Sequence, residues 1–258
     1  MMLLPALGLA FPKAEPVPGG ISIIPLASSD APKPSALFRG KPVLVAEHAG
    51  QWLAIIGIPL GSSPGLEFLQ VGDTEALLDI LPKQYVEQRI TLQDNKHVDL
   101  SVADAKRAQA DKKLSDKALA TQSTTSPQLE FKWPHPGPLS SPFGLQRFFN
   151  NQPRAPHSGL DIAAPQGDKI KSPAAGKVIL VGDFFFNGKT VFIDHGQGLI
   201  SMFCHMSSIK VKTGQWLKQG DVMGLVGKTG RATGPHIHWS LSLNNARVNP
   251  LLFLPPRP

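Results

Sequence analysis

Residues 234–243 read Gly-Pro-His-Ile-His-Trp-Ser-Leu-Ser-Leu, and this stretch decides the kind of fold and site that the chain can build. In a β-strand, successive side chains point to opposite faces. The alternation predicts an apolar face that belongs to a core and carries Ile237, Trp239, Leu241 and Leu243. The polar face carries His236, His238, Ser240 and Ser242. Two imidazoles on this face can approach one metal ion, or one can bind the ion while the other faces a substrate.

A second group of potential ligands lies upstream. His157-Ser-Gly-Leu-Asp161 places an imidazole and a carboxylate four residues apart, and His205 lies between this motif and the strand. The prolines and glycine around the motif favour a loop that runs into a short strand. One carboxylate with two histidines forms the three-ligand set of a catalytic zinc site, which keeps a fourth position for water. Structural zinc sites favour Cys, and Cys204 is the chain's one cysteine.

The rest of the C-terminal half also follows a β pattern. Strands are predicted at residues 177–181, 190–194, 199–204 and 222–226, with glycine-containing turns between nearly all of them. The chain has 24 glycines and 25 prolines in 258 residues. A largely helical protein could not easily accommodate so many helix breakers. We therefore expect a mainly β fold, with residues 129–258 as one β-rich domain.

The N-terminal half divides into three predicted segments. Residues 1–16 are apolar at first and resemble a secretory leader, which predicts export to the periplasm or cell envelope. Residues 17–100 are predicted to form a small β domain. Residues 101–128 begin with Ser101-Val-Ala-Asp104, which resembles a capping box, and predict a mostly solvated helix followed by a flexible linker. Such a linker would allow the N-terminal domain to dock on the C-terminal domain and restrain it.

Composition and charge narrow the range of partners. The formal net charge is +7, which suits an anionic polymer such as a cell wall, although an excess of lysine can also serve solubility alone. The sequence has no run of five basic residues and no motif typical of DNA or RNA recognition. Nucleic acid is therefore not expected as a partner. No stretch is long enough to span a membrane, and we expect a monomer.

The residues from about Phe131 onward resemble the LytM or lysostaphin type of zinc metallopeptidase, peptidase family M23. The similarity covers about half of the chain and rests on seven segments in order: residues 133–134, 141–144, 156–165, 176–178, 193–196, 204–207 and 230–239. Residues 52–60 resemble, more loosely, the small β domain that precedes the peptidase in some Gram-negative members. One departure is Met206, where the family usually has Leu after the middle histidine.

The resemblance implies a groove on a β-rich fold and a specific division of roles. One zinc ion would be bound by His157, Asp161 and His238, while His205 and His236 would be catalytic. Thr229, Arg231 and Thr233 lie on the loop before the last strand and are predicted to contact substrate. Cys204 invites comparison with a thiol nucleophile, but strand alternation places it with apolar neighbours, and a buried structural thiol is the preferred interpretation.

The expected activity is zinc-dependent hydrolysis of peptide crosslinks in bacterial peptidoglycan, with the D-alanyl–meso-diaminopimelate bond as the expected target. Two alternatives stay open from the sequence. Some relatives lack the metal ligands and activate wall amidases without catalysis, and others cleave glycine-rich crosslinks or proteins. The presence of every ligand in this chain argues against the first alternative.

Overall fold

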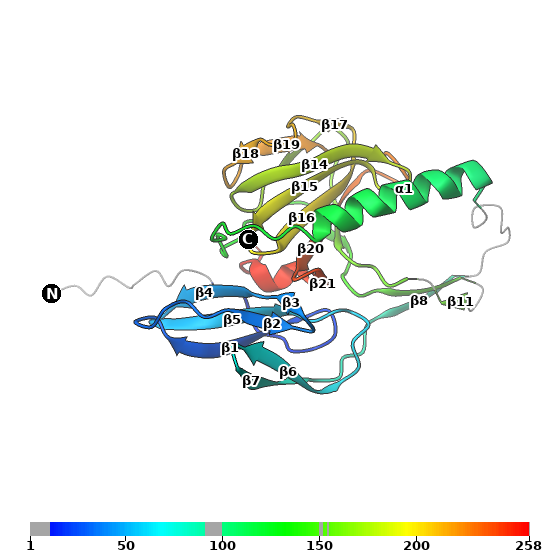
Figure 1. Cartoon of the computed structure of the whole chain (residues 1–258). Coiled ribbons are helices and arrows are strands. Elements are labelled where there is room, and N and C mark those ends of the chain that lie inside the picture. The colour runs from blue at the N-terminus through cyan, green and yellow to red at the C-terminus, as the bar shows by residue number, and fades with distance from the viewer. Residues whose placement is uncertain (1–10, 91–99, 150–151, 154, 258) are drawn as a thin grey trace.

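The computed structural model describes residues 11–90, 100–149, 152–153 and 155–257. The fold is mainly β, as the sequence predicts, with one α-helix in the described part of the chain. Figure 1 shows the N-terminal strands as one body, the C-terminal strands as a second body above it, and α1 along the side of the second. The first ten residues of the predicted leader lie outside the described residues.

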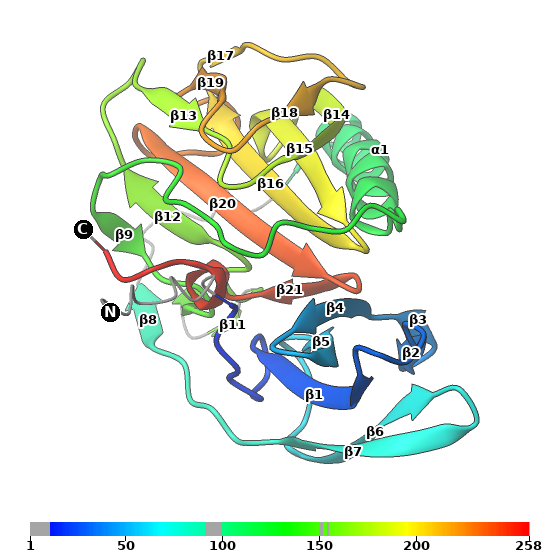
Figure 2. The same cartoon turned by 90° about the vertical axis from the view of Figure 1, so that its left-hand side faces the viewer.

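A large sheet forms the centre of the C-terminal half, in the order β18-β14-β15-β16-β20-β12-β9, with β21 paired to β20. Its strands are β9 (Leu139–Ser141), β12 (Leu160–Ala163), β14 (Gly176–Phe184), β15 (Gly188–Gly196), β16 (Leu199–Met206), β18 (Trp216–Leu217), β20 (His236–Leu243) and β21 (Ala246–Val248). Strand β20 lies between β16 and β12 (Figure 2). Most of the stretch 234–243 is therefore a central strand of the sheet.

One face of this sheet is the main hydrophobic core. The predicted apolar face of β20 is fully enclosed, since Ile237, Trp239, Leu241 and Leu243 are all 0% exposed. Trp239 stacks on Phe203 of β16, with ring centroids 5.5 Å apart. Burial of these large side chains fixes the register of β20, because a slip of one residue would bring the histidines into the core.

The N-terminal half contains two smaller sheets, ordered β1-β5-β4 and β3-β2-β6-β7. The strands are β1 (Ile21–Ser28), β2 (Ala36–Phe38), β3 (Lys41–Pro42), β4 (Leu44–His48), β5 (Gln51–Gly57), β6 (Gly65–Val71) and β7 (Thr74–Ile80). The β6–β7 hairpin was not among the predicted strands, although the sequence carries a hairpin signal there. Gly72-Asp73 forms a two-residue loop with Gly72 at φ 55°, between two runs with strand propensity.

Two further three-stranded sheets complete the fold. One has the order β13-β19-β17 and consists of β13 (Lys169–Lys171), β17 (Ser208–Ile209) and β19 (Val222–Leu225). The other has the order β11-β10-β8 and consists of β8 (Glu87–Ile90), β10 (Gln146–Phe149) and β11 (Gln152–Pro153). Strand β8 runs parallel to β10, so a segment of the N-terminal half is built into the C-terminal half.

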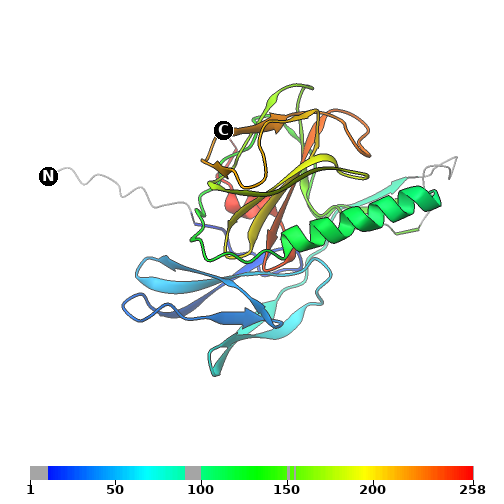
Figure 3. The same ribbon diagram turned by 45° about the horizontal axis from the view of Figure 1, so that its top comes forward.

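Helix α1 (Val102–Leu119) begins at Ser101, whose hydroxyl accepts a hydrogen bond from the backbone N–H of Asp104. Most of its surface is polar, and its buried residues are Ala118 and Leu119. These two pack with Phe184 and Met202, so α1 covers part of the sheet face opposite the main core (Figure 3). A short 3₁₀ helix, η1 (Pro250–Phe253), follows β21. Among the described residues, no helix is both long and apolar enough to cross a bilayer.

The two halves of the chain share one core and are joined by two side-chain amides. Gln197 bonds both backbone groups of Val45, accepting from its N–H and donating to its C=O at 3.2 Å each. Asn244 does the same with Gly57, at 2.6 and 2.9 Å. The linker after α1 is also bonded, since the N–H of Gln197 donates to the carbonyl of Ser123. The N-terminal body is thus docked on the large sheet.

Candidate metal centre

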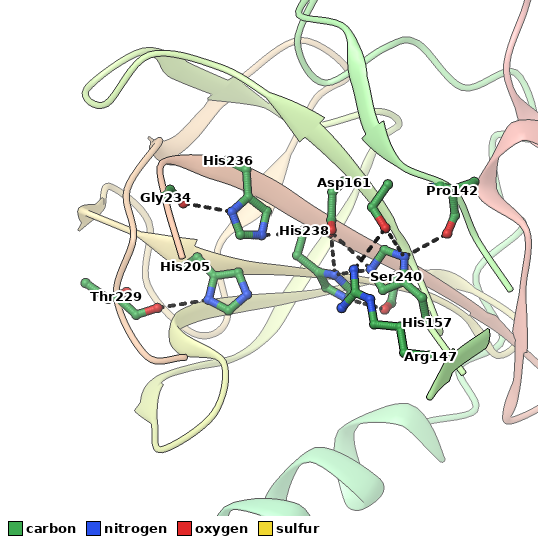
Figure 4. A network of polar contacts seen from close by, with 11 residues as sticks. Pro142, Arg147, His157, Asp161, His205, Thr229, Gly234, His236, His238 and Ser240 are labelled. Atoms are coloured by element: carbon green, nitrogen blue, oxygen red, sulfur yellow. Dashed lines mark hydrogen bonds and ion pairs between the residues drawn. The ribbon is translucent and has the colours of Figure 1, made fainter. Parts of the chain in front are cut away.

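Three predicted metal ligands converge at the start of β20. The Nδ1 of His238 lies 2.9 Å from the Oδ1 of Asp161, and the Nε2 of His157 lies 3.1 Å from each of these two atoms. Pairing of β12 with β20 places Asp161 directly opposite His238. His157 precedes β12 in a loop and turns its ring into the same site (Figure 4). The pairing of distant strands thus assembles the cluster that the sequence could only suggest.

Hydrogen bonds on the outer side of the rings fix which nitrogen faces the centre. The Nδ1 of His157 lies 2.8 Å from the carbonyl oxygen of Pro142, which can only accept, so the proton is on Nδ1. In this tautomer of the neutral ring, the Nε2 of His157 presents a lone pair to the site. The Nε2 of His238 lies 3.0 Å from the hydroxyl of Ser240, which leaves Nδ1 as its inward nitrogen. Outer partners of this kind orient metal-binding histidines in many proteins.

Glycine is required in the middle of the His157–Asp161 motif. A Cβ at Gly159 would lie 2.6 Å from the carbonyl oxygen of Trp239 and 2.8 Å from the ring of His238. Any larger residue would push the loop away from β20 and separate the ligands. The glycine that argued against a helix therefore permits close approach of the loop to the strand.

The donor set fits a zinc ion. Zinc bound tetrahedrally by nitrogen and oxygen at about 2.0–2.1 Å holds neighbouring donor atoms about 3.3 Å apart. The three donor atoms already lie 2.9–3.1 Å from one another. Two neutral imidazoles and one carboxylate also match the ligand set of open catalytic zinc sites. These residues can therefore hold a divalent ion with little rearrangement.

Electrostatics favour the ligand forms of Asp161 and His238. Burial raises the pKa of Asp161, but hydrogen bonds and charge from His157 and His238 outweigh burial and leave this pKa well below its usual range. Burial lowers the pKa of the His238 ring, although the nearby carboxylate acts in the opposite direction. The carboxylate is thus ionised and the imidazole neutral, as metal binding requires.

His205 reaches the same side of the sheet by a strained backbone conformation. Strand alternation predicted that it lies with Phe203, on the face opposite Cys204, and this prediction was wrong for the ring of His205. Its φ of 62° is in the left-handed region, which is uncommon for residues other than glycine. The imidazole comes to lie 4.8 Å from that of His236, measured between ring centroids. Such strain is typical of functional positions.

His205 and His236 each direct Nδ1 to a backbone carbonyl, and within the described residues Nε2 forms no hydrogen bond with the backbone. The Nδ1 of His205 donates to the carbonyl of Thr229 at 2.8 Å, and the Nδ1 of His236 donates to the carbonyl of Gly234 at 2.9 Å. The Nε2 of His236 lies 3.9 Å from Asp161. Burial lowers the pKa of His205 to about 4, so this ring is neutral near pH 7. Both rings can accept a proton beside the metal ligands.

The predicted substrate-contacting residues have different positions. Thr233 lines an open groove of about 290 Å³ together with Asp161 and His236. Arg231 is exposed and places its guanidinium 4.9 Å from the centre of the Phe186 ring. The hydroxyl of Thr229 is engaged within the protein, since it donates to the carbonyl of Met206 and accepts from the N–H of Lys189. Thr229 is therefore better placed to hold His205 than to contact substrate.

Sequence reasoning missed two polar residues that border the site. Arg147 of β10 donates to the hydroxyl of Ser141 at 3.2 Å and lines the groove (Figure 4). Ser240 bonds His238, and its place on the histidine face of β20 was a usable signal. Arg147 carried no such signal, because β10 lies beside the site through backbone hydrogen bonds that join Gly144 and Leu145 to His157. Cys204 is 0% exposed and burial raises its pKa to about 12, which supports its interpretation as a structural thiol.

Comparison with known proteins agrees with this geometry. The description "Peptidase family M23" matches residues 155–250, and "Peptidase family M23 N-terminal domain" matches residues 14–78. A DD-carboxypeptidase/endopeptidase from Neisseria meningitidis is 36% identical over 46% of this chain and 28% of its own length. The peptidoglycan DD-endopeptidase ShyA from Vibrio cholerae is 38% identical over 43% of this chain and 26% of its own length. The chain thus spans about a quarter of the length of these curated relatives.

A solved structure matches nearly the whole chain. The crystal structure of a Pseudomonas aeruginosa protein classed with the M23 peptidases is 46% identical, with a TM-score of 0.79. The match covers 93% of this chain and 95% of the other, so it includes both the N-terminal body and the large sheet. With both halves matched and the His157–Asp161–His238 cluster assembled, the chain belongs to peptidase family M23.

Proposed function

We propose that this protein is a zinc-dependent endopeptidase that hydrolyses peptide crosslinks of bacterial peptidoglycan. The observation that carries the proposal is the convergence of His157, Asp161 and His238 within 3.1 Å of one another, beside two further histidines. The name of the Vibrio relative, a peptidoglycan DD-endopeptidase, supports the substrate class, and the name of the Neisseria relative, a DD-carboxypeptidase/endopeptidase, supports the reaction. A purely non-catalytic binding role would not require this arrangement.

The residues around the cluster can perform the steps that peptide hydrolysis needs. Zinc, when bound, would polarise a peptide carbonyl and lower the pKa of a bound water towards about 7. His157, Asp161 and His238 would hold the ion. The Nε2 atoms of His205 and His236, when unprotonated, are placed to accept the proton of the attacking water and to donate it to the leaving amine.

The backbone carbonyls of Thr229 and Gly234 keep these two rings in the tautomer that can act as a base. Once protonated on Nε2, either ring can also donate a hydrogen bond to a developing oxyanion. Thr233 and Arg231 are proposed to contact the peptide on either side of the scissile bond, because Thr233 lines the groove and Arg231 lies exposed on the same loop.

We place the enzyme in the periplasm or elsewhere in the cell envelope, where its substrate lies. The leader-like start of the sequence and the net charge of +7 are consistent with an anionic wall substrate. The proposed target is the D-alanyl–meso-diaminopimelate bond, which the DD-endopeptidase names of the relatives support. Glycine-rich crosslinks and proteins are the competing substrates.

Metal analysis combined with digestion of purified sacculi tests the proposal. The full-length protein should bind one zinc ion per chain and release soluble muropeptides, whose masses identify the bond. His157→Ala and His238→Ala should lose both the zinc and the activity, because each removes one of only three ligands. His48→Ala, which changes a histidine in the N-terminal body, should retain both. If His157→Ala digested sacculi at the parental rate, the assignment would be wrong.

A further inference from the structure

A second cavity, of about 440 Å³, lies between α1 and the sheet face that α1 covers. Helix α1 contributes one row of residues to it, and the sheet contributes Phe184, Met202 and Arg247. Phe186 and Asn187, at the tip of the β14–β15 hairpin, complete the wall. The backbone carbonyl of Asn187 accepts a hydrogen bond from the backbone N–H of His205, so the hairpin tip lies between this cavity and the metal centre.

Arg247 carries the charge that the cavity leaves unsatisfied. Arg247 of β21 pairs with Ser242 of β20. This pairing directs the Arg247 side chain to the sheet face below α1. The side chain is largely buried, yet no group in the described residues accepts a hydrogen bond from its guanidinium. The hydroxyl of Ser242, which is 1% exposed, also lacks a partner in this part of the structure. A buried charge without an acceptor is costly, so an external anion would stabilise it.

The acidic residues of the cavity already have partners within the protein, and neither accepts a hydrogen bond from Arg247, although the charge of Asp116 acts on the guanidinium electrostatically. Asp116 accepts from the ammonium of Lys112 at 2.5 Å. Asp111 accepts from the backbone N–H of Phe185 at 2.7 Å, a contact that ties α1 to the hairpin. These carboxylates disfavour a doubly charged ligand such as phosphate, and they leave the planar guanidinium to bind a single carboxylate through two parallel hydrogen bonds. The apolar side chains of Phe184, Phe186 and Met202 offer contact to small alkyl groups.

We propose that this cavity is a second binding site, separate from the metal centre, for the carboxylate of a short peptide. Arg247 binds the carboxylate, the aromatic and methionine side chains contact the apolar side chains next to it, and the acidic residues of α1 accept from peptide N–H groups. The inference concerns binding and does not depend on the proposed hydrolysis. The peptide could belong to the substrate strand or be a released fragment, because both carry the same group.

Calorimetric titration of the zinc-loaded, full-length protein tests the site. The probe is N-acetyl-D-alanyl-D-alanine, which joins one carboxylate to two small apolar side chains, and its C-terminal amide is the neutral control. We expect the acid to bind and the amide to bind at least about tenfold more weakly, since a charge-assisted pair is lost. Inorganic phosphate should not compete. Displacement of the probe by phosphate at equal concentration would contradict the carboxylate assignment.

Two variants of Arg247 and one control variant distinguish probe binding in this cavity from probe binding at the metal. Arg247→Gln should abolish binding, and Arg247→Lys should weaken it several-fold because an ammonium cannot form the paired bonds. Arg257→Gln, which removes an exposed arginine elsewhere, should bind like the parent. Parental affinity in both Arg247 variants would overturn the proposal, because the probe would then be bound at the zinc or another surface. Circular dichroism checks that each variant is folded.

The same probe distinguishes the two sources of the peptide. If the site holds the substrate strand, the probe should inhibit sacculus digestion competitively. If it holds a released fragment as an effector, the probe should change the maximal rate of the parent and leave that of Arg247→Gln unchanged.

Discussion

At the scale of single residues, His195 shows how completely this fold can enclose an imidazole. It lies near the end of β15 and is 2% exposed. Its Nδ1 donates to the carbonyl of Ala175 at 2.8 Å, and its Nε2 accepts from the hydroxyl of Ser201 at 2.8 Å. The indole N–H of Trp239 donates to the same hydroxyl at 3.2 Å. The ring is therefore a neutral member of a buried hydrogen-bond network.

This burial makes His195 a source of pH-dependent stability. Burial lowers its pKa to about 4, whereas the unfolded chain takes up the proton near pH 6.5. Between these values the unfolded state binds more protons, so the free energy of unfolding falls as the pH is lowered. For metal-free protein in EDTA, the loss from this group between pH 7.5 and pH 5 should be about 2 kcal/mol in urea unfolding.

His195→Gln should have lower stability at both pH values but a smaller difference between them, because the amide does not titrate. Other buried histidines, such as His205, contribute equally in both proteins to the dependence of the unfolding free energy on pH. If the unfolding free energy of the parent and of the variant changed equally with pH, His195 would not be the titrating group.

At the scale of one element, β20 combines a core face with a ligand face. The period of two assigns alternate residues to the core, and the sequence predicted both faces correctly. The polar face is open only near its start, because α1 and neighbouring side chains bury Ser240 and Ser242 further along. Ser240 and Ser242 therefore lie on the same face of the same strand and are both buried. They differ in one hydrogen bond. Ser240 bonds His238, and Ser242 has no partner in the described residues.

This pair provides a matched test of the outer support of the metal ligand. Ser240→Ala removes the acceptor that orients His238, so the affinity for zinc should fall by roughly 10- to 100-fold. Ser242→Ala removes an equally buried hydroxyl, and its zinc affinity should stay parental. Competition with a chromophoric chelator measures both. Equal affinities in the two variants would mean that Ser240 does not support the ligand.

At the scale of the whole molecule, the N-terminal body is fixed to the end of the large sheet away from the histidines. Gln197 lies in the turn between β15 and β16, and Asn244 lies in the turn between β20 and β21. The metal ligand His238 lies near the opposite end of β20. Ile21 and Leu44 of the N-terminal body belong to the same buried cluster as the large sheet. In this arrangement the described strands β1–β7 pack on the end of the large sheet that carries Gln197 and Asn244, and restraint of the peptidase half by the N-terminal domain stays a prediction.

Asn244 should be a principal point of attachment. Asn244→Ala leaves the backbone N–H and C=O of Gly57 buried without partners, which should cost about 2–4 kcal/mol of unfolding free energy in urea. Asn245→Ala is the matched control, because both residues have positive φ, at 42° and 63°, but Asn245 is exposed. It should cost no more than about 1 kcal/mol. A similar loss in both variants would attribute the effect to backbone strain alone.

The sequence by itself determined the mainly β fold, the two faces of β20 and the identity of the potential ligands, because strand periodicity and donor chemistry are local properties. Only the tertiary structure decided how these parts combine. Pairing of β12 with β20 brings Asp161 to His238, and the left-handed conformation of His205 turns its ring away from its predicted face. Strand β8 joins β10 from more than 50 residues away, and α1 closes a cavity over Arg247. Contacts between distant segments depend on the packing of the whole chain, which no short stretch of sequence encodes.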